Sequence, residues 1–162
     1  MLHSFLRTVV ALSFMSIASA VTAEESDHLA TKGGIEILHA WTNATSGDHA
    51  RVYMEISSEA EGDVVLIGGE SAMAADVHMI GLTYGADGAI EREIEQFPIK
   101  AGSEIDLTPD GLFLELHGLT QALAEGDDFE LHLFFEPIGE IEVHVEVEAA
   151  GAVEHSHAGH NH

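Results

Sequence analysis

The amino-acid sequence predicts an all-β fold, either an antiparallel β-sandwich or a barrel, and three observations lead to this prediction. Apolar and polar residues alternate with a period close to two through most of the chain. Gly, Asp, Asn and Pro separate the alternating runs at short intervals, as they do between short antiparallel strands. Hydrophobic residues make up 46% of the 162 residues, enough to bury a core despite a formal net charge of -24. The length fits one domain with appendages.

The alternating runs predict a series of strands and one brief helix. The expected strands cover residues 35–41, 51–56, 64–67, 76–80, 89–97, 104–107, 112–117, 129–135 and 140–148, and residues 120–125 are expected to be helical. The strand at 140–148 is the clearest, because its isoleucine and valines share one face and its acids and histidine share the other.

The last two predicted strands each carry a histidine on the polar face. If the loop between them is Pro137-Ile138-Gly139, the register places His132 directly opposite His144. Directly opposed side chains have Cβ atoms about 5 Å apart, close enough for two imidazoles to share a metal ion. The alternative is two solvated histidines on an exposed face.

The N-terminus predicts a secretory signal peptide over residues 1–23. Arg7 supplies a positive start, and the apolar run at 8–20 is too short to span a bilayer comfortably. Small residues follow, and cleavage is expected after Ala23. A polar lead (24–32), a folded domain (33–149) and a tail (150–162) then follow. The expected location is the periplasm, without membrane insertion after cleavage; the alternative is an uncleaved anchor.

Composition excludes several classes of function. Five Lys and Arg against 29 Asp and Glu exclude nucleic-acid and anionic-membrane partners, which require clustered positive charge. The absence of cysteine excludes thiolate nucleophiles, disulfides and cysteine-based metal sites. The sequence has no Ser/His/Asp pattern, phosphate-binding glycine loop or HExxH motif, so an enzyme is not expected. The 12 histidines are the unusual feature, and with methionine they are the residues available for soft-metal chemistry.

The C-terminal tail is the first candidate metal site. It carries His155, His157, His160 and His162 within its last eight positions. Such tracts lack the apolar residues to fold alone, and neutral imidazoles bind Cu(II), Zn(II) or Ni(II). The tail is therefore expected to be disordered and to bind a metal; the alternative is a solubilising disordered end.

Several local signatures, taken in order, resemble the PCu(A)C family of periplasmic copper chaperones over roughly residues 35–149. These signatures are the segments 39–44, 52–56, 69–79, 97–102, 107–111, 116–119 and 123–127. The resemblance implies a cupredoxin-like, immunoglobulin-like β-sandwich that binds copper. A monomer is expected. It also implies delivery of copper to the Cu(A) centre of cytochrome c oxidase, so that the expected partner is an oxidase subunit or another periplasmic copper protein.

The family's Cu(I) ligands follow the pattern His-Met-x10-Met-x21-His-x-Met, and this chain matches the pattern only in part. His78 matches the first histidine, with Met79 beside it. The other ligand positions hold Ile90, Phe113 and Glu115. A family-type Cu(I) site is therefore incomplete.

A different ligand set is predicted in its place. Phe113, Glu115 and His117 share one face of the strand expected at 112–117. If that strand lies near His78, as the family fold implies, then His78, Glu115 and His117 can converge. Two imidazoles and a carboxylate suit Cu(II) or Zn(II) better than Cu(I), and Met54, Met73 or Met79 would add a thioether. The alternative is a lapsed site with three ordinary surface residues.

Two functions are consistent with these patterns. The first is a periplasmic copper metallochaperone with an altered ligand set. The second is a periplasmic protein that binds or sequesters Cu(II) or Zn(II) through the tail and the mixed His/Glu site.

Overall fold

A computed structural model describes residues 28–86 and 88–155, and every regular element in these ranges is a strand. The predicted signal peptide and the tail histidines beyond residue 155 lie outside the described residues. The strands are β1 (Leu29–Lys32), β2 (Ile35–Asn43), β3 (His49–Ser58), β4 (Val64–Glu70), β5 (Asp76–Gly85), β6 (Gly88–Glu93), β7 (Phe97–Ile99), β8 (Glu104–Leu107), β9 (Leu112–His117), β10 (Asp128–Glu136) and β11 (Gly139–Glu148). Within these ranges no helix is long and apolar enough to cross a membrane.

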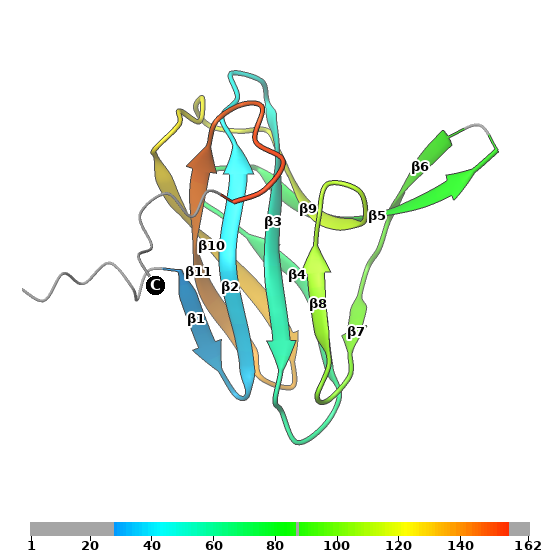
Figure 1. Ribbon diagram of the computed structural model, residues 1–162. Coiled ribbons are helices and arrows are strands. Elements are labelled where there is room, and N and C mark those ends of the chain that lie inside the picture. Colours follow the sequence, from blue (N-terminus) through cyan, green and yellow to red (C-terminus); the bar gives the residue numbers. More distant parts are fainter. Residues whose placement is uncertain (1–27, 87, 156–162) are drawn as a thin grey trace, which may run out of the picture.

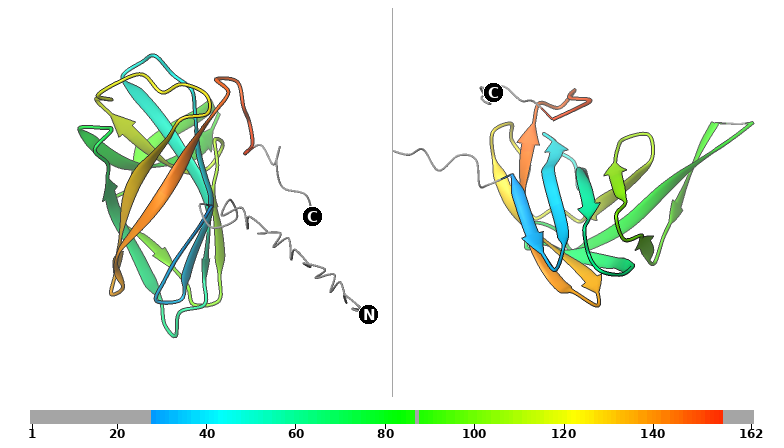
Figure 2. Two further views of the ribbon diagram at one scale, coloured as in Figure 1. Left: turned by 90° about the vertical axis from the view of Figure 1, so that its left-hand side faces the viewer. Right: turned by 60° about the horizontal axis from the view of Figure 1, so that its bottom comes forward.

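One continuous sheet forms both layers of the fold. Its strand order is β6-β5-β9-β8-β3-β2-β11-β10-β4-β7, with β1 added on β2 and a further pairing of β9 with β3. The sheet curls over itself, so that β10 and β4 lie behind β2 and β3 (Figures 1 and 2). The predicted all-β sandwich is therefore confirmed. Most pairings are antiparallel, but β11 pairs with β2 and β8 with β9 in parallel.

The core forms where the apolar faces of the strands meet between the layers. On β10 every second residue from Phe129 to Phe135 is buried, and on β11 every second residue from Ile141 to Val147 is buried. This is the alternation that the sequence predicted for the last two strands. By contrast, β6 is exposed along its whole length, and the β5–β6 hairpin projects from the body of the sandwich (Figure 1).

The structure differs from the predicted elements at three places. The polar lead contains a strand, β1, which pairs with β2. The predicted strand at 89–97 is two strands, because β6 pairs with β5 whereas β7 pairs with β4 at the sheet edge, where Pro98 is tolerated. The predicted helix at 120–125 does not form: Leu123 is buried in the core and bridges to Thr45.

The predicted pairing of His132 with His144 is also wrong. The β10–β11 hairpin turns about Pro137, so Phe135 pairs with Gly139, His132 with Glu142, and Glu130 with His144. This register differs from the predicted one by two positions, which preserves the faces of both strands and changes every cross-strand partner. His132 instead places Nδ1 2.7 Å from Oε1 of Glu140.

The turn between β1 and β2 depends on two glycines with positive φ, Gly33 and Gly34. A Cβ atom at Gly34 would lie 2.7 Å from the backbone nitrogen of Ala60, and its φ of +85° disfavours any side chain. We expect Gly34→Ala to lower the free energy of unfolding by about 2 kcal/mol, measured by chemical denaturation. Gly62→Ala is the matched control, because nothing lies within 4 Å of its added Cβ. Equal stability of the two variants would contradict the expectation.

Candidate metal centre

The structure brings together the three residues of the predicted mixed site. Strands β5 and β9 are antiparallel neighbours, and His78 pairs directly with Glu115. The rings of His78 and His117 lie 4.8 Å apart between centroids, nearly perpendicular to each other. Nε2 of His117 lies 2.8 Å from Oε2 of Glu115. We call His78, Glu115 and His117, with His49 described next, the β5–β9 site.

A third histidine, for which the sequence predicts no role, extends this site. Strand β3 pairs with the other side of β9, and His49 lies opposite His117. Their ring centroids are 4.4 Å apart. His49 was overlooked because the strand predicted at 51–56 in fact begins at residue 49. Three imidazoles therefore form a row across three strands, with the side chains of His78 and His117 about one-third exposed.

Glu115 is the charged centre of the site. Burial alone would raise the pKa of its carboxyl group, but hydrogen bonds from His117 and Arg51 outweigh burial and hold that pKa below its usual value. Arg51 donates from Nε to Oε1 of Glu115 at 3.2 Å and pairs with Glu91 at 2.6 Å. Glu115 is therefore an anion that already has a cationic partner.

The site borders an open groove of about 540 Å³. The groove is lined by Asn43, Ala44, Thr45, His49, Ala50, Arg51, Tyr53, Glu115, His117 and Ala150. Phe113 is fully buried in a small cluster with Trp41, Tyr53 and Ile80, and the Arg51 guanidinium lies 4.4 Å from the Phe113 ring centroid. The site is thus open to solvent on one side and supported by packed side chains on the other.

The structure does not bring a methionine to this site from the described residues. Met79, a predicted ligand, follows His78 on β5 and therefore points to the opposite face, where it is 4% exposed in the core. Met54 is buried in the same core, and Met73 packs against it. Of the other family positions, Phe113 is buried, and Ile90 lies on the projecting hairpin opposite Thr83.

The beginning of the predicted tail is ordered against the domain. Nδ2 of Asn43 donates to the carbonyl oxygens of Ala149 and Ala152, which holds the segment after β11. His155 is 7% exposed, and its Nδ1 lies 3.0 Å from Glu148. The prediction of a disordered tail is therefore wrong for residues 150–155. The other predicted tail ligands, His157, His160 and His162, lie outside the described residues.

The available donors in the β5–β9 site are imidazole nitrogens and a carboxylate oxygen. Cu(II) and Zn(II) accept such ligands, whereas Cu(I) favours thioethers and thiolates. The site as folded is therefore chemically suited to a divalent ion.

Comparisons with known proteins agree with this fold. The apo PCuAC domain of PmoF2 is 26% identical, with a TM-score of 0.67 over 78% of this chain and 99% of that domain. A copper-bound PCuAC domain from PmoF2 is 27% identical, with a TM-score of 0.64 over 75% of this chain and 98% of that domain. Apo-DR1885 from Deinococcus radiodurans is 17% identical, with a TM-score of 0.54 over 93% of this chain and all of that one, and it shares the fold.

The predicted resemblance to PCu(A)C proteins is confirmed by these structures. No curated protein sequence matches the chain significantly. The family profile described as LpqE-like matches residues 35–147, which spans the sandwich from β2 to β11. The chain therefore belongs to the LpqE-like family.

Proposed function

We propose that this protein is an exported copper-binding metallochaperone that holds copper at the β5–β9 site. The observation that carries the proposal is the convergence of His78, Glu115 and His117 on adjacent strands. The fold that presents them is similar to a domain described as copper-bound, at 27% identity. The role is one of binding and transfer, not of catalysis.

The donor set favours Cu(II) as the bound ion. The site offers imidazoles and a carboxylate, and the described methionines pack in or against the core. This same observation supports the second candidate function, sequestration of Cu(II) or Zn(II). Transfer is favoured over storage by the exposure of the ligands, because the side chains of His78 and His117 are 35% and 36% exposed beside an open groove.

Export and delivery are the finer parts of the proposal. The signal-like residues 1–23 support export to the periplasm. Delivery to the Cu(A) centre of cytochrome c oxidase follows from the resemblance to PCu(A)C chaperones, and the groove beside His117 is the surface on which a copper acceptor would dock.

The test is a Cu(II) titration against a competing chelator, using full-length protein in which His157, His160 and His162 are replaced by alanine. His28 is also replaced by alanine and Glu146 by glutamine, because this ion pair elsewhere on the sheet offers another set of metal ligands. In this background we expect His117→Ala to weaken Cu(II) binding at least tenfold, because one ligand is lost. His144→Ala is the matched control, since His144 is exposed and lies outside the β5–β9 site. Electron paramagnetic resonance should show nitrogen ligation that diminishes in His117→Ala.

Two outcomes would overturn parts of the proposal. Equal Cu(II) affinity of the His117→Ala and His144→Ala variants would remove the β5–β9 site as the copper site. Tight metal binding with no transfer of copper to an acceptor protein would replace the chaperone with the sequestering function.

A further inference from the structure

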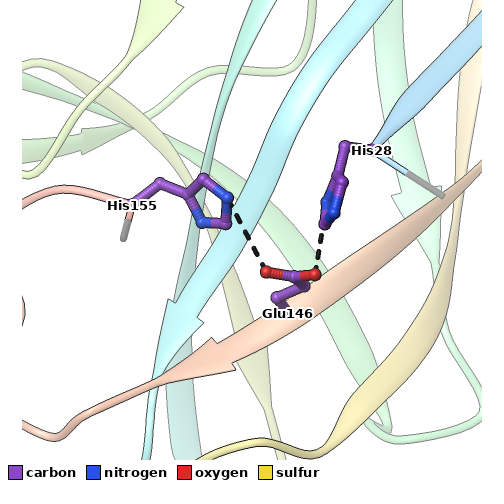
Figure 3. A group of neighbouring side chains, drawn as sticks. All are labelled: His28, Glu146 and His155. Carbon is purple, nitrogen blue, oxygen red and sulfur yellow. Dashed lines mark ion pairs between the residues drawn. The ribbon is translucent and has the colours of Figure 1, made fainter. Parts of the chain in front are cut away.

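A second group of histidines and acids lies on a different part of the sheet. His28 precedes β1, Glu146 lies on β11, and His155 follows the turn after β11. One ligand atom from each of these three residues lies within 4.8 Å of the others. In Figure 3 the two imidazoles lie next to each other, and each faces one oxygen of the Glu146 carboxylate.

The distances show how the carboxylate is shared. Nδ1 of His28 lies 3.2 Å from Oε1 of Glu146, and Nε2 of His155 lies 3.7 Å from Oε2. The two oxygens of one carboxylate therefore face two different rings. Ligands of one tetrahedral ion are separated by similar distances, because each lies about 2 Å from the metal.

Burial distinguishes this group from the many exposed acid–histidine pairs of the chain. The side chain of His155 is 5% exposed and that of His28 is 19% exposed. Glu148 adds a second carboxylate, whose Oε1 lies 3.0 Å from Nδ1 of His155. Two carboxylates thus approach one buried imidazole, and a bound cation would balance their charge.

The backbone brings a third imidazole to the group. His39 has a φ of +51°, the one positive value for a residue other than glycine within the described ranges. It lies where the β2–β3 register shifts between Leu38 and Trp41. Its ring stacks on that of His155 with centroids 5.4 Å apart, and its backbone nitrogen donates to the carbonyl oxygen of His28. Bulges commonly redirect a side chain toward a site in this way.

We propose that His28, Glu146 and His155 form a second metal site, separate from the β5–β9 site, for a divalent transition-metal ion of the Zn(II) or Cu(II) class. Two imidazoles and a carboxylate are a recognised ligand set for such ions, and His39 is placed to support or complete it. The proposal does not depend on the proposed function, because the two sites share no residue. A bound ion would link the residue before β1 to the segment after β11.

The test uses Zn(II) as the probe and full-length protein that lacks two histidines of the β5–β9 site and three histidines of the C-terminal tail. His78, His117, His157, His160 and His162 are replaced by alanine in this parent. We expect the parent to bind one equivalent of Zn(II) and to gain thermal stability on binding. Glu146→Gln and His28→Ala, each added to the parent, should weaken binding at least tenfold, whereas His144→Ala should leave it unchanged. Imidazole nitrogen chemical shifts of His28 and His155 should move on addition of Zn(II).

Failure of this proposal is distinguishable from failure of the proposed function. Absence of Zn(II) binding by a folded parent would overturn the second site and leave the β5–β9 site untouched. Binding that survives both Glu146→Gln and His28→Ala would also overturn it. Repeating the titration with Cu(II) determines which of the two ions the site prefers.

Discussion

Replacing Phe113 by alanine is expected to lower the free energy of unfolding by about 3–5 kcal/mol. The ring is fully buried beside the β5–β9 site, in a cluster with Tyr53 and Ile80, and its removal leaves a cavity that the surrounding side chains can fill only in part. The Arg51 guanidinium also rests on this ring, so its position beside Glu115 should loosen. Chemical denaturation monitored by circular dichroism measures the loss.

The control for this prediction is Ile90→Ala. Ile90 is 49% exposed on the projecting hairpin, so its truncation should change stability by less than about 1 kcal/mol. If Phe113→Ala lost no more stability than Ile90→Ala, the small apolar cluster would not support the site.

Replacing Arg51 by leucine is expected to raise Cu(II) affinity at the β5–β9 site by about 10- to 100-fold. Arg51 occupies Oε1 of Glu115 and places a positive charge beside the position of the metal ion. A unit charge about 6 Å from a divalent ion repels it by more than about 1 kcal/mol even at the dielectric constant of water, and by more near a protein surface. Leucine keeps an apolar side chain against Phe113, removes the charge and adds no donor atom for copper.

Lys100→Leu is the matched control, because it makes the same change in net charge at an exposed residue paired with Asp63. Competitive titration of both variants at low and high salt separates a local effect from a global one. If Arg51→Leu bound Cu(II) no more tightly than Lys100→Leu, Glu115 would not be a copper ligand. If the prediction holds, Arg51 keeps copper binding weak enough for transfer.

The fold was predictable where apolar and polar residues alternate over a long strand, and less so where a strand is short or polar. The faces of β10 and β11 were predicted correctly because each has an apolar stripe with a period of two. Their register was not, because alternation permits a shift of two residues, and the centre of the turn decides it. Strand β1 was overlooked because its four residues are mostly exposed and form a strand only by pairing with β2.

The two groups of ligands were predictable to different degrees. His78, Glu115 and His117 come from strands whose faces could be read from the sequence. The family resemblance predicted that these two strands lie close together. The group of His28, Glu146 and His155 joins the start of the described chain to its end. No local pattern marks such a group, because only the closure of the sheet and the backbone irregularity at His39 bring the residues together.

The parallel pairing of β11 with β2 has a consequence for the order in which the polypeptide folds. It joins Trp41 to Glu146, and the nearby hydrogen bond from Asn43 to Ala149 spans 106 positions of the chain. Contacts this distant in sequence form late and slow the folding of β proteins, since a long loop must close first. The β2–β11 pairing therefore cannot form until β11 has been synthesised. A nascent chain that lacks β11 leaves one edge of β2 without its final neighbour, so the sandwich cannot close before residues 139–148 are available.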